Sequence, residues 1–107
     1  MNDTQPGIDR PLIPMETLER VAPIIRNAAH PLRLRILDYL QQEDGPRSVT
    51  QITRAADAPQ AIVSQQLRIL KDQGILTARR AGSFVYYSIR NRSVLLLLDC
   101  IRSHQGR

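Results

Sequence analysis

The chain has 107 residues, which fits one domain with a modest hydrophobic core. Fifteen Lys and Arg residues against ten Asp and Glu residues give a formal net charge of +5, a basic balance that raises affinity for phosphate groups. The sequence has no stretch of about eighteen apolar residues, which excludes a membrane span; its single cysteine, Cys100, excludes an intrachain disulfide and fits a reducing cytoplasm.

Residues 1–14 differ in composition from the rest, with prolines, a glycine and no apolar run of the kind found in a signal peptide. Such a segment buries too little apolar surface to stay ordered, so the sequence predicts a flexible tail there. The remaining residues, 15–107, are expected to form one domain.

The spacing of apolar residues predicts two helices after the tail. The first covers residues 15–29, where the interior proline Pro23 is expected to kink or split the helix. The second covers residues 31–42, with His30 as its cap and Pro31 at the first helical position.

Residues 48–76 predict a helix-turn-helix, with short helices over 50–56 and 60–72 joined by a tight turn. On a helical wheel, Val63 and Leu67 lie on the apolar side of the second helix, and the opposite side is polar with a single charge. Small and amide side chains on that side suit a helix that lies in the major groove and hydrogen-bonds to base edges. The residues of this helix expected to contact DNA are Gln60, Ala61, Ser64, Gln65 and Arg68.

After Ile75 the apolar period changes to two, which predicts a β-hairpin centred on Gly82. Its basic tip is expected to form a wing that crosses the phosphate backbone or enters the minor groove. Tyr86 and Tyr87 alternate across the hairpin, so one is expected to pack in the core while the other is free to reach a phosphate. The tip residues expected to contact DNA are Arg79, Arg80 and Ser83.

The last predicted helix, over residues 92–104, is apolar around most of its circumference because of the run 94–98. One small domain cannot cover so much apolar surface, so a second copy of the chain is the expected cover. The residues expected at this dimer interface are Leu18, Ile25, Val94, Leu97, Leu98 and Ile101.

Three other side chains have both a structural and a chemical interpretation. His30 is expected to cap a helix rather than bind a ligand. Arg33 lies between apolar positions of its helix, which favours a buried ion pair over a DNA contact. Cys100, inside an apolar helix, is expected to be a small core residue rather than a thiol sensor.

The predicted order, α-α-α-α-β-β-α, gives a mainly α fold with a small β-hairpin, a winged helix-turn-helix. In this order and spacing the chain resembles the ArsR/SmtB (arsenic-repressor) family of bacterial regulators from about residue 15 to residue 104. The resemblance implies a homodimer joined by its first and last helices, which binds a twofold-symmetric operator and represses until an inducer binds. The matching residues are 29–37, 63–67, Leu70, 74–76 and 79–87.

The inducer sites of the family do not match this sequence. Ser48 and Thr50 stand where one metal site has cysteines, and hydroxyls are poor ligands for soft metals. Redox-sensing relatives pair a cysteine on the second helix with one on the last, but the second-helix position here is Asp38. The second metal site of the family corresponds to Asn91, Ser93, His104 and Arg107. Only His104 has a side chain of the kind that binds zinc, and one imidazole does not make a zinc site. The sequence therefore predicts no metal and no cofactor.

The sequence shows no nucleophile–base pair, acid–base pair or glycine-rich phosphate loop, so an enzyme is not expected. The sequence instead predicts a dimeric repressor that binds operator DNA in a sequence-specific manner. Two alternatives remain: a family member that senses metal or thiol chemistry through unrecognised ligands, and a protein-interaction module that has lost DNA binding. The intact polar face at Ser64 and Gln65 argues against the second alternative.

Overall fold

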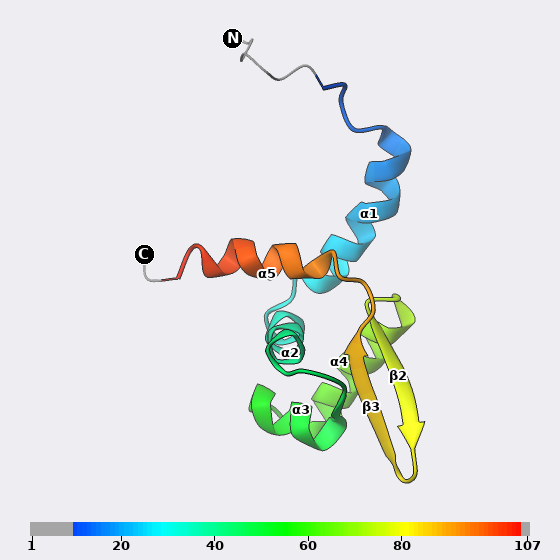
Figure 1. Ribbon diagram of the computed structural model, residues 1–107, viewed down its shortest axis with the longest axis vertical. Coiled ribbons are helices and arrows are strands. Elements are labelled where there is room, and N and C mark those ends of the chain that lie inside the picture. The colour runs from blue at the N-terminus through cyan, green and yellow to red at the C-terminus, as the bar shows by residue number, and fades with distance from the viewer. Residues whose placement is uncertain (1–9, 106–107) are drawn as a thin grey trace.

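The computed structural model describes residues 10–105, so most of the predicted tail lies outside the described residues, and residues 10–14 form neither helix nor strand. The predicted order of helices and hairpin strands is confirmed, with one further short strand (Figure 1). None of the described helices is both long and apolar enough to cross a membrane. The elements are α1 (Met15–Ala28), α2 (Pro31–Gln42), β1 (Arg47–Ser48), α3 (Val49–Ala56), α4 (Gln60–Asp72), β2 (Leu76–Ala81), β3 (Phe84–Ile89) and α5 (Val94–Arg102).

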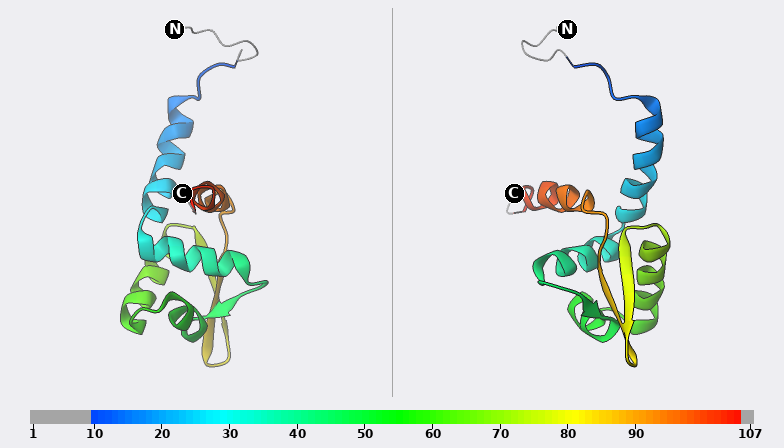
Figure 2. Two further views of the ribbon diagram at one scale, coloured as in Figure 1. Left: turned by 90° about the vertical axis from the view of Figure 1, so that its left-hand side faces the viewer. Right: turned by 45° about the vertical axis from the view of Figure 1, so that its right-hand side comes forward.

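Helices α2, α3 and α4 surround one hydrophobic core, and the sheet closes its remaining side with the strand order β1-β3-β2. Helix α1 projects away from this body, and α5 lies across the same end of the molecule (Figures 1 and 2). The tip of the β2–β3 hairpin lies at the opposite end. The two helices expected at the dimer interface, α1 and α5, are therefore far from the hairpin tip. The helix-turn-helix lies between that pair of helices and the tip.

Local sequence explains why the helix-turn-helix forms. At the start of α3 the Ser48 hydroxyl accepts from the Gln51 backbone N–H at 3.2 Å, and the Gln51 side chain accepts from the Ser48 N–H at 2.9 Å. This reciprocal capping box satisfies two N–H groups that the helix itself leaves free. Asp57 then adopts a left-handed conformation with φ of 54°, which ends α3 and leaves a short turn before α4.

The core confirms the faces predicted from helical spacing. Helix α4 buries Val63, Leu67 and Leu70, and α2 buries Ile36 and Leu37, all at 0% exposure. A core this small tolerates little loss, because each buried aliphatic side chain contributes ~1.5–3 kcal/mol. The position of α4 is thus fixed from inside, while its other face stays open.

Helix α1 is continuous through Pro23, so of the two predicted outcomes, a kink or a split, the split does not occur. The carbonyl that loses its backbone donor to Pro23 belongs to Glu19, an exposed residue. Strand β1 was not predicted: Arg47 and Ser48 pair with Tyr87 and Tyr86 of β3. Two residues carry too little periodicity to indicate a strand, and only the nearby edge of β3 gives them partners.

Candidate nucleic-acid interface

The outer face of α4 is polar and open. Gln60, Ala61, Gln65 and Arg68 are exposed and Ser64 is half-buried, as the helical wheel predicted. Gln66 is the exception on this helix, because its side chain is only 9% exposed and turns inward. The four exposed residues and Ser64 are called the reading face below. Their short hydroxyl and amide groups can donate to and accept from base edges in a major groove.

The hairpin tip is also exposed. Gly82, with φ of 64°, makes the turn, and Arg79, Arg80 and Ser83 are all exposed. Arg79 lies opposite Tyr86, whereas Arg80 lies opposite Val85. Because side chains alternate along a strand, the two arginines point to opposite faces of the hairpin.

The two tyrosines of β3 have separate surroundings, which the sequence left open. Tyr87 packs against the hydrophobic core. Tyr86 lies on the other side of the strand, where its ring centroid is 6.3 Å from that of Phe84. Phe84 is 55% exposed, so this second face of the hairpin is the one that is free to meet a ligand.

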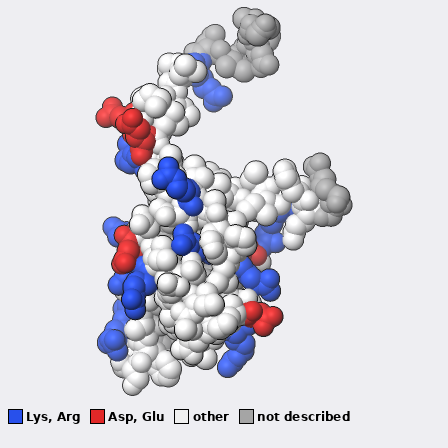
Figure 3. Space-filling model, turned by 180° about the vertical axis from the view of Figure 1, so that it is seen from behind, with Lys and Arg blue, Asp and Glu red and all other residues white. Residues whose placement is uncertain are grey.

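Lys and Arg side chains lie near these elements and elsewhere on the surface. Figure 3, which views the molecule from behind, shows them along the edge where α4 and the hairpin lie, with an acidic group among them, and also on the opposite edge and along α1. A basic edge beside an open polar helix suits a phosphate backbone on either side of a groove.

The positions that correspond to metal sites of the resembling family have other roles here. Ser48 is buried and caps α3, and Thr50 is exposed. His104 is exposed beside the Ser103 hydroxyl, at 3.5 Å, and Arg107 lies outside the described residues. Among residues 10–105, no group of three or more His, Cys, Asp or Glu side chains lies close enough to hold a metal ion.

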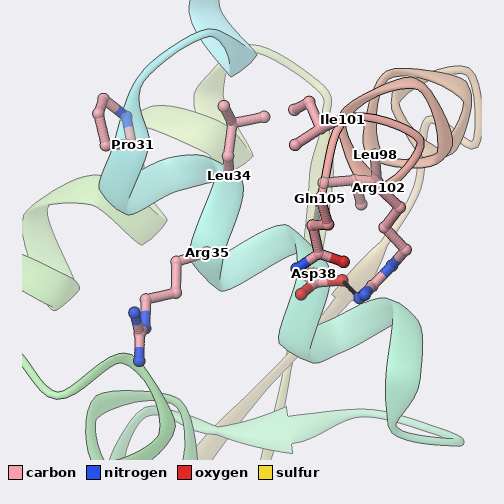
Figure 4. A pocket seen from close by; sticks show the side chains of 8 residues that line it. All are labelled: Pro31, Leu34, Arg35, Asp38, Leu98, Ile101, Arg102 and Gln105. Atoms are coloured by element: carbon pink, nitrogen blue, oxygen red, sulfur yellow. Dashed lines mark hydrogen bonds and ion pairs between the residues drawn. The ribbon is translucent and has the colours of Figure 1, made fainter. Parts of the chain in front are cut away.

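Asp38 joins α2 to α5. Its carboxylate forms an ion pair with Arg102 and accepts from the Gln42 amide at 3.3 Å. Figure 4 shows this ion pair at the rim of an open hollow of about 340 Å³ whose walls include Leu34, Leu98 and Ile101. The α2 position where redox-sensing relatives have a cysteine is therefore occupied by a carboxylate that is paired with α5.

Cys100 is exposed, so the prediction that it is a small core residue is wrong for the single chain. Helix α5 buries Val94 and Leu98, which are four residues apart and share one face. Cys100 follows Leu98 by two residues, a rotation of about 200°, so its thiol lies on the opposite side of the helix.

The apolar run of α5 divides between two surfaces. Val94 and Leu98 are 1% and 4% exposed within their own chain, so they belong to its core and offer a partner almost no surface. Leu96, which sequence reasoning missed, is 72% exposed. Leu97 is half-buried.

A continuous apolar run does not indicate which residues face the core, because every side of the helix is equally apolar. Large apolar side chains exposed on α1 and α5 include Leu18, Ile25, Leu96 and Ile101, which together are called the apolar face, and Met15 is also exposed at the start of α1.

A groove of about 300 Å³ runs through this face between α1 and α5. Ile25 lines it from α1, and Leu96 and Leu97 line it from α5. Its walls are aliphatic except for Ser93, so it suits the apolar side chains of another helix.

Comparison with known proteins places the chain in a family. Residues 30–78 match the model of the bacterial regulatory protein arsR family. Over 95 residues the chain is 37% identical to the HTH-type transcriptional regulator NmtR of Mycobacterium tuberculosis, covering 87% of this chain and 78% of that one. It is 34% identical over 94 residues to the transcriptional repressor SmtB of the same species, covering 87% of this chain and 67% of that one.

Solved structures agree with this sequence similarity. The AntR antimony-specific transcriptional repressor matches with a TM-score of 0.81 at 30% identity, covering 100% of both chains. The homodimeric winged helix-turn-helix DNA-binding domain Mb0332 from Mycobacterium bovis matches with a TM-score of 0.69 at 31% identity, covering 90% of this chain and 87% of that one. These matches confirm the predicted winged helix-turn-helix fold. The chain therefore belongs to the ArsR family of bacterial transcriptional regulators.

Proposed function

We propose that the chain is a dimeric repressor that recognises a twofold-symmetric operator through α4 and the β2–β3 hairpin. The family consists of transcriptional regulators rather than enzymes. The observation that carries the proposal is the reading face, which is open, polar and carries one charge, Arg68, although it lies on a helix whose other side is buried. A helix that needed only solubility would usually carry Glu and Lys there, whereas amide and hydroxyl groups suit hydrogen bonds to base edges.

Each DNA-facing element has its own proposed task. Ser64 and Gln65 read base edges in the major groove, together with Gln60, Ala61 and Arg68 at its margins. Arg79, Arg80 and Ser83 contact the sugar-phosphate backbone beside the minor groove. Phosphate contacts fix the register of the protein on the duplex, and base contacts select the sequence.

The dimer is proposed from the apolar face. Leu18, Ile25, Leu96 and Ile101 are exposed on α1 and α5, at the end of the molecule opposite the hairpin tip. A homodimer is the state given for the similar Mb0332 domain. Pairing through this face would point both reading faces toward the same side of a duplex, with half-sites about 34–36 Å apart as in other helix-turn-helix dimers.

Selection from a random library of DNA duplexes tests the proposal. The protein should enrich one sequence with two inverted half-sites, and sedimentation at micromolar concentration should show a dimer. Failure to enrich any sequence would favour the alternative of a protein-interaction module. A monomer that binds the palindrome with full affinity would contradict the proposed role of the dimer.

We also propose that no metal regulates this protein, because Ser48, Thr50, Asn91 and Ser93 replace the ligands of the family sites. Zinc, nickel or arsenite is expected to leave the operator complex intact in a mobility-shift titration. A stoichiometric site of submicromolar affinity that His104→Ala abolishes would contradict this and support the metal-sensing alternative.

A thiol response is likewise not expected. Cys100 is exposed, but the α2 position that would pair with it is Asp38, whose carboxylate is held by Arg102. Peroxide or a persulfide donor should therefore affect operator binding of wild type and Cys100→Ser equally. A response by wild type that Cys100→Ser lacks would establish Cys100 as a sensor.

A further inference from the structure

Arg33, in the first turn of α2, is hydrogen-bonded to two other helices, α1 and α4. Its Nε donates to the Oε1 of Gln66 on α4 at 2.5 Å, and its Nη1 donates to the backbone carbonyl of Asn27 on α1 at 3.0 Å. No ion pair among residues 10–105 includes Arg33, so the predicted buried ion pair is replaced by two neutral acceptors.

The acceptor on α1 is left free by the sequence itself. The carbonyl of Asn27 would bond to the backbone N–H four residues later, but that residue is Pro31, which has none. The nearer N–H, that of His30, donates to Ala28 at 2.8 Å instead. Carbonyls at the end of a helix carry partial negative charge, so a guanidinium is the group that satisfies this one best.

The acceptor on α4 belongs to the helix that carries the reading face. Gln66 follows Gln65 directly, and its side chain is 9% exposed and turned toward Arg33. A second contact supports the same junction: the amide of Asn27 donates at 3.0 Å to the Oε1 of Gln73, the residue directly after α4. Helices α1 and α4 are thus tied together at two points by polar side chains.

We propose that Arg33 is a positioning residue that holds α4 in a fixed orientation relative to α1, so that the two reading faces of a dimer stay in register with two half-sites. This proposal rests on the proposed dimeric repressor. Helix α1 bears part of the apolar face, and α4 bears the reading face. When these two helices are held in a fixed orientation, binding of the second half-site loses little further conformational entropy, because the second reading face is already in place.

The link has a measurable signature. Loosening α4 alone would weaken the paired operator by the square of the factor lost on a single half-site, because each of the two reading faces loses that factor. Loosening the orientation of α4 relative to α1 weakens the paired operator by more than this square, because only there must both faces be aligned at once. The affinity for the paired operator divided by the square of the affinity for a single half-site is therefore the ratio that reports on the link.

The experiment measures this ratio for the full chain with Arg33→Met, Gln66→Leu and the double variant, using a duplex selected from the random library and the same duplex with one half-site scrambled. Each single variant is expected to lower the ratio about tenfold or more, and the double variant to lower it no further than the worse single variant. Gln66→Glu, which keeps an acceptor for Arg33, is expected to retain most of the wild-type ratio. Thermal unfolding checks that each variant is folded.

The control is Arg35→Met, which removes the same charge from an exposed position two residues along α2. It should leave the ratio unchanged. If Arg33→Met does not fold, Gln66→Leu alone decides the result. An unchanged ratio in Gln66→Leu, with a loss on the paired operator that is only the square of the loss on a single half-site, would overturn the link. A wild type without preference for paired half-sites would instead contradict the dimeric repressor.

Discussion

Replacing Leu96 by glutamate is expected to convert a dimer of this chain into folded monomers with little operator affinity. Leu96 is 72% exposed and lines the groove between α1 and α5. Most of its side chain is therefore uncovered within the single chain and would be buried only by a partner subunit. Burying a leucine contributes ~1.5–3 kcal/mol, and a twofold interface repeats the contact. The total loss is then ~3–6 kcal/mol before the cost of burying two carboxylates is added. Sedimentation should show a monomer at micromolar concentration, and titration should show at least a ~100-fold loss of operator affinity.

Two variants separate the causes of this effect. Leu96→Gln removes the apolar group without adding charge and should weaken the dimer less. Leu98→Glu places the same charge at a position that is 4% exposed within the chain, so it should lower the unfolding temperature strongly. A Leu96→Glu protein that sediments as a dimer and binds the operator normally would contradict the assignment of the apolar face.

The second large effect concerns base recognition. Gln65→Ala and Ser64→Ala are expected to weaken binding to the selected operator by ~1–3 kcal/mol for each lost base contact, and to leave binding to random DNA nearly unchanged. Arg79→Ala and Arg80→Ala should weaken both DNAs and reduce the salt dependence of binding by about one unit each. Titrations of both duplexes at several salt concentrations measure these differences.

Gln42→Ala is a matched control, because Gln42 is an exposed glutamine at the end of α2 and not on α4. It should change neither affinity. Equal losses on operator and random DNA for all four DNA-facing variants would contradict the division between reading face and wing. Opposite-facing Arg79 and Arg80 give a finer test, since their effects should add if they contact different phosphates.

The sequence alone determined the five helices, the hairpin and the two faces of α4. Helical spacing separated Val63 and Leu67 from Ser64 and Gln65 on α4, and the change to a period of two placed the hairpin around Gly82. These features succeed because they are local: the backbone period decides which side chains share a face before any packing occurs. The capping pair Ser48 and Gln51 is local in the same sense, since both groups lie within one helical turn.

Tertiary structure decided what depends on neighbours distant in the sequence. Val94 and Leu98 face the core and Leu96 faces outward only because α5 packs with one side on its own domain. Arg33 finds an amide of α4 and a carbonyl of α1 rather than a carboxylate, and Gln66 is 33 residues away from it along the chain. A hydropathy pattern records that a side chain is apolar or charged, but its partner is fixed only when separate helices are brought together.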